Sequence, residues 1–284
     1  TKMQLEEYLD LMSSVSEFGM NAGLNTQDLY SKTLQNETSN LWVISVSHKT
    51  SLDNYGILYS PRDEYKPNFN RQLTLPVIPA PLEQIEKYKA RALEVDAEYF
   101  CKKCIASGGK VELSSDFLKL SKVEQVEYAL HEAFHATSKQ FFGRKVEQLS
   151  FEYEEGSALI VGYLGAVNYF RNTNLAEDAE RHWQKHFTLA RKVNKFVGEL
   201  EEIYAFRVGE DQRPVPQEQK LREKEELLKK ARIELSDNLG TPINNAFFIY
   251  WHPFYGKLEQ MYDKVKNAKD FTEVVRRLTV SEKW

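Results

Sequence analysis

Apolar residues recur at three- and four-residue steps through most of the chain, which is the spacing of amphipathic helices. The clearest stripe lies between Ser121 and Gly143, and its members are Val123, Val126, Leu130, Phe134, Thr137 and Phe141. Ser121 and Glu124 form the S-x-x-E capping box that typically begins a helix. A glycine such as Gly143 commonly ends one. We therefore expect one continuous helix between these two ends, with one buried face.

The same spacing predicts further helices at residues 1–40, with a break at Gly19–Gly23, and at residues 81–107, 149–170, 175–207 and 221–240. A last helix begins at Asp270, its N-cap, with Glu273 three residues on. The segment LWVISVSH, from Leu41, alternates and is rich in β-branched residues, so it predicts a strand. Residues 54–81 are rich in Pro, Asn and Tyr and predict an irregular segment. The expected fold class is mainly α with a small β element.

Composition and charge exclude several classes of function. The chain has 284 residues, enough to bury a core, with 38 basic and 42 acidic side chains and a net charge of −4. This balance gives no basic surface for nucleic acid. No apolar run reaches the roughly 20 residues that span a bilayer. The first residues lack the basic and apolar regions of a signal peptide and do not begin with Met. The compartment therefore stays open, and export to a periplasm with removal of a signal is compatible with it.

Cys101 and Cys104 form a C-x-x-C, which occurs in zinc sites, redox pairs and local disulfides. A structural zinc site needs two further ligands, and the sequence has no second C-x-x-C. The pair lies at the end of the helix expected at residues 81–107. We interpret both cysteines as inert thiols on one helix face.

The segment HEAFH, residues 131–135, places an H-E-x-x-H motif inside the helix expected between Ser121 and Gly143. Residues four apart share a helix face, so His131 and His135 can converge on one zinc ion. Glu132 projects about 100° away and can reach a water molecule at the metal as a general base. A pair of surface histidines on an ordinary helix is the alternative interpretation.

A catalytic zinc site needs a third protein ligand and an open position for water. The H-x-x-G-x-x-H continuation of metzincins is absent after His135. The next helix instead carries Glu152, Glu154 and Glu155 in the stretch EYEEGSA. Only one of the adjacent Glu154 and Glu155 can point at the metal, because successive helical side chains diverge by about 100°. The spacing alone leaves both candidates open.

H-E-x-x-H followed by E-G-x-A about twenty residues later resembles the gluzincin metallopeptidases. Within them the chain is most similar to a family of bacterial zinc aminopeptidases, through LWVISVSH, HEAFH with EEGSA, and PINNAFFIYWHPFYGKLEQMYD. The resemblance implies a gluzincin-like fold in which the H-E-x-x-H helix packs against a second helix carrying the third ligand. It implies His131, His135 and Glu155 as zinc ligands and Glu132 as the base, with Glu154 the alternative ligand.

These residues predict zinc-dependent hydrolysis of a peptide or protein substrate. A later Tyr or His commonly stabilises the oxyanion in gluzincins, and the candidates are Tyr250, His252 and Tyr255. The resemblance suggests an aminopeptidase, in which Glu152 or Glu154 would bind the free amine. An endopeptidase, a zinc hydrolase of other amides, and a metal-binding scaffold without turnover are the alternatives. The oligomeric state is not indicated.

Three other features have ordinary interpretations. His182 and His186 form a second i, i+4 pair, which we assign to a solvated helix face rather than a second metal site. His48 is expected in a turn, and Asn244 and Asn245 at a helix start. Residues 1–110 would hold the N-terminal helices, strand and irregular segment, and residues 111–284 the helical zinc-binding catalytic region. One continuous compact domain is the alternative.

Overall fold

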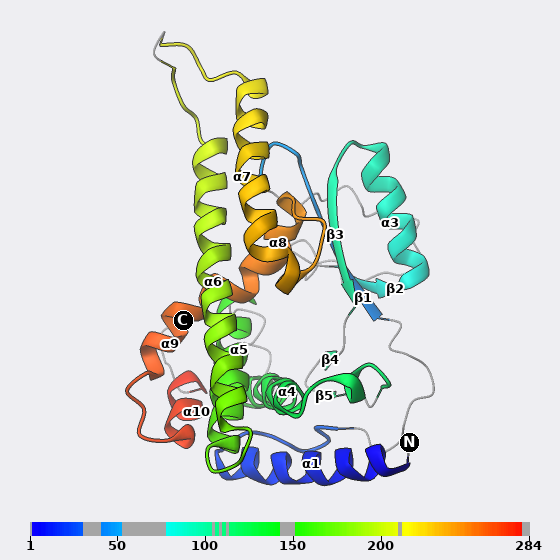
Figure 1. The fold of residues 1–284 in the computed structure, drawn as a ribbon, viewed down its shortest axis with the longest axis vertical. Helices are drawn as coiled ribbons and strands as arrows, with labels where there is room; N and C mark the ends of the chain where they lie inside the picture. Colours follow the sequence, from blue (N-terminus) through cyan, green and yellow to red (C-terminus); the bar gives the residue numbers. More distant parts are fainter. Residues whose placement is uncertain are drawn as a thin grey trace. The chain divides into compact units, whose positions relative to one another are not determined.

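The computed structural model describes residues 2–30, 41–52, 78–103, 106–107, 110–111, 114–142, 151–209 and 212–279. These residues are mainly helical, with one three-stranded and one two-stranded antiparallel sheet (Figure 1), which confirms the prediction of a mainly α chain with a small β element. The chain separates into two compact units. Unit 1 comprises Thr1–Asn40, Cys104–Ala190 and Phe254–Trp284, and unit 2 comprises Leu41–Lys103 and Arg191–Pro253. The domain boundary expected near residue 110 stays a prediction.

Unit 1 is built around two packed helices, α4 (Lys122–Phe142) and α5 (Phe151–Phe170). The glycines of α5 allow a close approach, since a Cβ at Gly165 would lie 2.5 Å from Leu130 Cδ1 of α4. Around this pair lie α1 (Lys2–Asn21), α9 (Leu258–Val265), α10 (Phe271–Thr279) and the hairpin of β4 (Ala106–Ser107) and β5 (Lys110–Val111). The apolar α5 is buried over most of its length, as its sequence predicts.

The predicted starts of two helices in unit 1 are confirmed, whereas the helix end predicted at Gly143 lies outside the described residues. The Ser121 backbone N–H donates to Glu124 Oε2 at 2.8 Å, and the Glu124 N–H donates to Ser121 Oγ at 3.2 Å, which completes the capping box. The Glu273 N–H donates to Asp270 Oδ1 at 2.8 Å at the start of α10. The stripe of α4 is buried from Val123 to Thr137. Phe141 differs from the prediction, because its side chain is exposed.

Unit 2 holds a three-stranded sheet in the order β2 (Ile78–Pro81), β1 (Leu41–Ser47), β3 (Glu98–Lys103). Ile44 and Val46 of β1 pack with Ile85, Tyr88 and Ala92 of α3 (Leu82–Glu94). Phe100 of β3 contacts Phe247 and Tyr250 of α8 (Asn245–Tyr255), with ring centroids 5.2 and 5.1 Å apart. The strand predicted at LWVISVSH is thus the central strand of a sheet that has packed helices on both faces.

Unit 2 also contains α7 (Gln217–Leu239) and the second half of the long helix α6 (Ala176–Tyr204). These two segments lie side by side (Figure 1). Lys192 of α6 pairs with Glu234 of α7, at 3.4 Å. The division between the units falls within α6 and again within α8. Among the described residues, no helix combines the length and hydropathy that a membrane crossing requires.

The helix predicted over residues 81–107 is wrong in its second half. The helix α3 ends at Glu94, and Asp96 adopts a φ of +56°, a left-handed conformation that cannot continue a helix. The chain then enters β3, where it pairs with β1 and buries Phe100 on one face, while Tyr99 and Cys101 are partly buried against the core beside α3. Cys101 therefore lies on a strand, half-buried beside the α3 face, and Cys104 lies outside the described residues.

Candidate metal centre

The H-E-x-x-H segment lies in the middle of α4, and α5 packs closely against α4 beside its first residue. A Cβ built at Gly162 of α5 would lie 2.8 Å from the Glu127 carbonyl oxygen and 3.3 Å from His131 Cβ. Only a glycine allows this approach without displacing α4. Glu155 lies seven residues, about two helical turns, before Gly162 and therefore on the same face of α5. The close contact thus brings Glu155 towards the histidines of α4.

Three side chains converge between the two helices. His131 Nε2 lies 3.1 Å from His135 Nε2 and 3.5 Å from Glu155 Oε2, and His135 Nε2 lies 3.5 Å from Glu155 Oε1. Tetrahedral zinc with ligand bonds of 2.0–2.2 Å would place neighbouring ligand atoms about 3.4 Å apart. The observed separations match that value. Among the described residues, these three form the only group of histidine, cysteine and acidic side chains close enough to hold a metal ion.

The chemistry of the three side chains also fits a cation. All three are about nine-tenths buried, and Glu155 Oε2 has no hydrogen-bond partner among the described residues. A buried carboxylate oxygen without a donor is costly, so a native structure normally compensates it with a donor or an ion. Two imidazoles and one carboxylate are a common protein ligand set for zinc. His131, His135 and Glu155 would therefore be the ligands.

Glu154 has a different position from Glu155. Its Oε1 lies 3.1 Å from His135 Nδ1, on the side of the imidazole away from the candidate metal position. A carboxylate in this place accepts the Nδ1 proton, which leaves Nε2 with a lone pair directed at the metal. The structure thus separates two residues that the sequence left as alternatives. Glu155 is the ligand candidate, and Glu154 orients His135.

The buried charges shift the pKa values of all three candidate ligands. Burial, and then the neighbouring His135, lower the pKa of His131 to about 4, so His131 is neutral at pH 7. Burial also disfavours the charged form of His135, but the carboxylates of Glu155 and Glu154 outweigh it and raise its pKa well above the ordinary value. Burial opposes ionisation of Glu155, but His135 outweighs it and lowers the Glu155 pKa. Without a metal, His135 and Glu155 form an ion pair.

Glu132 is buried, with 4% of its surface exposed, and its negative charge contributes to the raised pKa of His135. The carboxylate is therefore close enough to His135 to act on it electrostatically. Its catalytic role stays a prediction, as do the roles of the three residues predicted as oxyanion donors.

Those three residues belong to different parts of the molecule. Tyr250 lies in unit 2, where its ring contacts Phe100 and Trp251, and His252 is half-buried in the same unit. Tyr255 belongs to unit 1, like the candidate ligands. Its side chain is buried, and its hydroxyl lies 3.1 Å from His186 Nδ1. Of the three, Tyr255 is placed within the same compact unit as the candidate metal centre.

The second histidine pair is not on a solvated helix face. His182 Nε2 lies 3.0 Å from Glu127 Oε2 of α4, and only 17% of the His182 side chain is exposed. The sequence predicted a solvated helix face for this pair because the partner of His182, Glu127, is 55 residues away in the chain. No local pattern links them. The available signal was the position of Glu127, four residues before His131 and so on the ligand face of α4.

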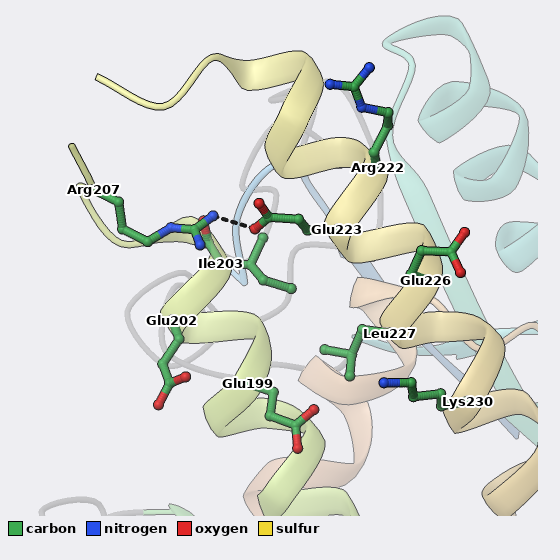
Figure 2. Close-up of a pocket in the computed structure, with 9 residues that line it drawn as sticks. All are labelled: Glu199, Glu202, Ile203, Arg207, Arg222, Glu223, Glu226, Leu227 and Lys230. Atoms are coloured by element: carbon green, nitrogen blue, oxygen red, sulfur yellow. Dashed lines mark hydrogen bonds and ion pairs between the residues drawn. The ribbon is translucent and has the colours of Figure 1, made fainter. Parts of the chain in front are cut away.

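Unit 2 contains a shallow groove between the end of α6 and the start of α7 (Figure 2). Arg207 and Glu223 pair across it at 2.5 Å, and four glutamates and three basic residues are among the side chains that line it. All the lining residues belong to unit 2, whereas the candidate ligands belong to unit 1. The groove is therefore separate from the candidate metal centre.

The predicted resemblance to gluzincins rests on the ligand pattern alone. Compared with known protein families, curated proteins and solved structures, the chain matches none of them. The structure places His131, His135 and Glu155 together as a buried triad on two packed helices, and this triad is a candidate metal-binding site.

Proposed function

We propose that this chain is a zinc-dependent peptidase of the gluzincin type, with Glu132 as its general base. The observation that carries the proposal is the convergence of His131, His135 and Glu155 within tetrahedral reach of one another, with Glu132 buried on the same helix as the two histidines. Three protein ligands leave one position of a tetrahedral zinc free for water, as in catalytic rather than structural sites. A purely structural site has no use for a buried glutamate at this point of the motif.

Zinc bound by this triad would polarise a scissile carbonyl and make a water molecule acidic near neutral pH. Glu132 would serve there as the general base and would return the proton to the leaving nitrogen of the peptide. Glu154 holds His135 in the tautomer that binds metal through Nε2. Tyr255 is our candidate for the donor to the oxyanion, and an aminopeptidase is the subclass that the sequence resemblance favours.

Glu132→Gln tests the proposal, because glutamine keeps the size of the side chain and removes its basicity. Wild-type protein and variant are loaded with zinc, and hydrolysis is followed on a library of quenched fluorescent peptides and on aminoacyl coumarin amides. We expect the variant to retain one zinc per chain and to lose at least about a hundredfold in rate, the usual contribution of a general base. Equal rates in the two proteins would reject Glu132 as the base.

The two substrate sets also decide the subclass. Cleavage of the aminoacyl coumarin amides together with peptides that have a free amine would support an aminopeptidase. Cleavage within peptides whose amines are blocked would support an endopeptidase. No cleavage of either set by zinc-loaded wild-type protein would contradict the proposed peptidase function while leaving the metal site intact.

A further inference from the structure

Unit 1 holds a second group of polar side chains that contact one another, one turn along α4 from His131. We call it the Glu127 layer; its members are Glu127, Tyr163, His182, His186 and Tyr255. They come from α4, α5, α6 and α8. Four residues of helix rise by about 6 Å, which is the separation along α4 between this layer and the first candidate ligand.

The hydrogen bond between His182 Nε2 and Glu127 Oε2, 3.0 Å long, links α6 to α4. The Glu127 side chain is 7% exposed. Gly162 of α5 lies so close to α4 that an added Cβ would meet the carbonyl oxygen of Glu127 and the Cβ of His131. Three helices are thus fixed to one another beside the candidate ligands.

The other members of the Glu127 layer contact one another beside the hydrogen bond between His182 and Glu127. The Tyr163 ring stacks on His186 with a centroid distance of 5.0 Å, and His186 Nδ1 lies 3.1 Å from the Tyr255 hydroxyl. Burial and then the Glu127 charge raise the pKa values of Tyr163 and Tyr255 well above the ordinary value. Both tyrosines therefore stay protonated at neutral pH and keep hydroxyl groups that can donate hydrogen bonds.

An apolar layer would stabilise the fold at least as well, since replacing buried ion pairs by packed apolar residues is often neutral or stabilising. Buried polar pairs can instead specify how helices are aligned. The tolerance at a metal site is narrow, about 0.2 Å in each ligand distance. A rotation of α4 by about 10° would move an imidazole nitrogen about 6 Å from the helix axis by roughly 1 Å.

We propose that Glu127 and His182 are positioning residues of the metal centre, whose hydrogen bond holds α4 in the rotation at which His131 and His135 meet Glu155. The proposal rests on the metal site of the proposed function, but not on peptidase activity. It predicts that loss of this hydrogen bond weakens metal binding in a protein that is still folded.

The test compares His182→Gln with His182→Asn. The glutamine amide nitrogen can occupy the place of the histidine Nε2 and still donate to Glu127, whereas the asparagine amide is one methylene too short. Zinc affinity is measured by chelator competition on the full chain, at a temperature at which circular dichroism shows both variants folded. A control variant, Lys192→Gln with Glu234→Gln, removes another ion pair of α6 that lies in unit 2.

We expect His182→Asn to raise the Kd for zinc by about 10- to 100-fold, the usual effect of losing an outer partner of a metal site. The Kd of His182→Gln and of the control variant should stay within about threefold of wild type, below that range. Equal zinc affinities in His182→Asn and His182→Gln would overturn the positioning role. Failure of wild-type protein to bind zinc would overturn the metal site itself, and this proposal with it.

Discussion

Unit 1 and unit 2 each place a glutamate of low exposure beside nitrogen-containing partners, Glu155 next to two histidines and Glu98 next to Lys224. In unit 2, Glu98 pairs with Lys224 through one oxygen and accepts from the Asn245 N–H at 2.8 Å through the other. In unit 1, Glu155 Oε2 has no hydrogen-bond partner among the described residues. Glu98, with a partner on each oxygen, is typical of a glutamate that stabilises the fold. Glu155, with one oxygen lacking a donor, is typical of a metal ligand.

Glu98 and Lys224 belong to a hydrogen-bond network in unit 2 whose polar groups all have partners. Lys224 also donates to the Lys49 carbonyl at 2.9 Å, and Asn245 Nδ2 donates to the carbonyls of His48 and Ser51, both at 2.9 Å. The Tyr204 hydroxyl donates to Asn245 Oδ1 at 2.8 Å. These bonds fix the turn after β1 to the start of α8. The comparison therefore predicts that substitutions here reduce stability, and that substitutions around Glu155 reduce metal binding.

The largest effect is expected for Lys224→Met, which leaves the Glu98 carboxylate without its cation. Removing one partner of a buried ion pair costs about 3–5 kcal/mol of unfolding free energy. Urea unfolding of the metal-free protein would measure this loss. Because Lys224 and the candidate ligands belong to different units, zinc affinity of the folded variant should be unchanged. If Lys224→Met were as stable as wild type, Glu98 would have no structural role and would not differ from Glu155 in the way described.

Gly162→Ala tests the close approach of α4 and α5. The added Cβ would meet the Glu127 carbonyl oxygen at 2.8 Å, so the helices must separate. Overpacking of this kind costs about 1–3 kcal/mol, and the zinc affinity should fall with it. Gly198→Ala in α6 is the matched control, because among the described residues nothing beyond its own helix backbone lies within 4 Å of its added Cβ. That variant should gain about 0.5–1 kcal/mol from helix propensity. Equal effects of the two substitutions would contradict the packing described.

Glu154→Gln sharpens the distinction between a ligand and its outer partner. The variant keeps the three candidate ligands but loses the carboxylate that accepts from His135 Nδ1. The Kd for zinc should rise by about 10- to 100-fold while the bound stoichiometry at saturating zinc stays at one. Chelator competition measures the first and metal analysis the second. Complete loss of zinc at saturation would mean that Glu154 is itself a ligand.

The smallest effect is the dependence of zinc affinity on pH. In the metal-free protein the raised pKa of His135 keeps this side chain protonated at neutral pH, and zinc can bind only after the proton leaves. Zinc affinity should therefore fall as the pH falls, by up to tenfold per unit below that pKa, or about 1.4 kcal/mol. Titration calorimetry in buffers of different ionisation enthalpy should show about one proton released at pH 7. No proton release would contradict the His135–Glu155 ion pair.

The sequence was informative where the geometry is local. His131 and His135 are four residues apart on a helix that the apolar stripe between Ser121 and Gly143 predicts, so their shared face follows from helix periodicity. Their meeting with Glu155 depended on the apolar pattern of α5, which predicts a buried neighbouring helix. Glu154 and Glu155 could not be separated in this way. Their roles depend on the rotation of α5, which Gly162 sets through its contact with α4.

The errors fall where tertiary contacts override local pattern. Residues 98–103 follow a helical pattern without a strong stop signal, yet pairing with β1 and burial of Phe100 against α8 make them a strand. His182 looked solvated because its neighbours are basic, but Glu127 reaches it from another helix. In both cases the deciding partner is distant in the sequence.

Metal analysis of purified protein tests the metal centre most directly. Wild type and Glu155→Gln are exposed to zinc, freed of excess metal by gel filtration and analysed by mass spectrometry, with folding checked by circular dichroism. Wild-type protein should retain about one zinc per chain, whereas folded Glu155→Gln should retain almost none. Equal zinc content in the two proteins would contradict Glu155 as a ligand, and absence of zinc from wild type would contradict the site as a whole.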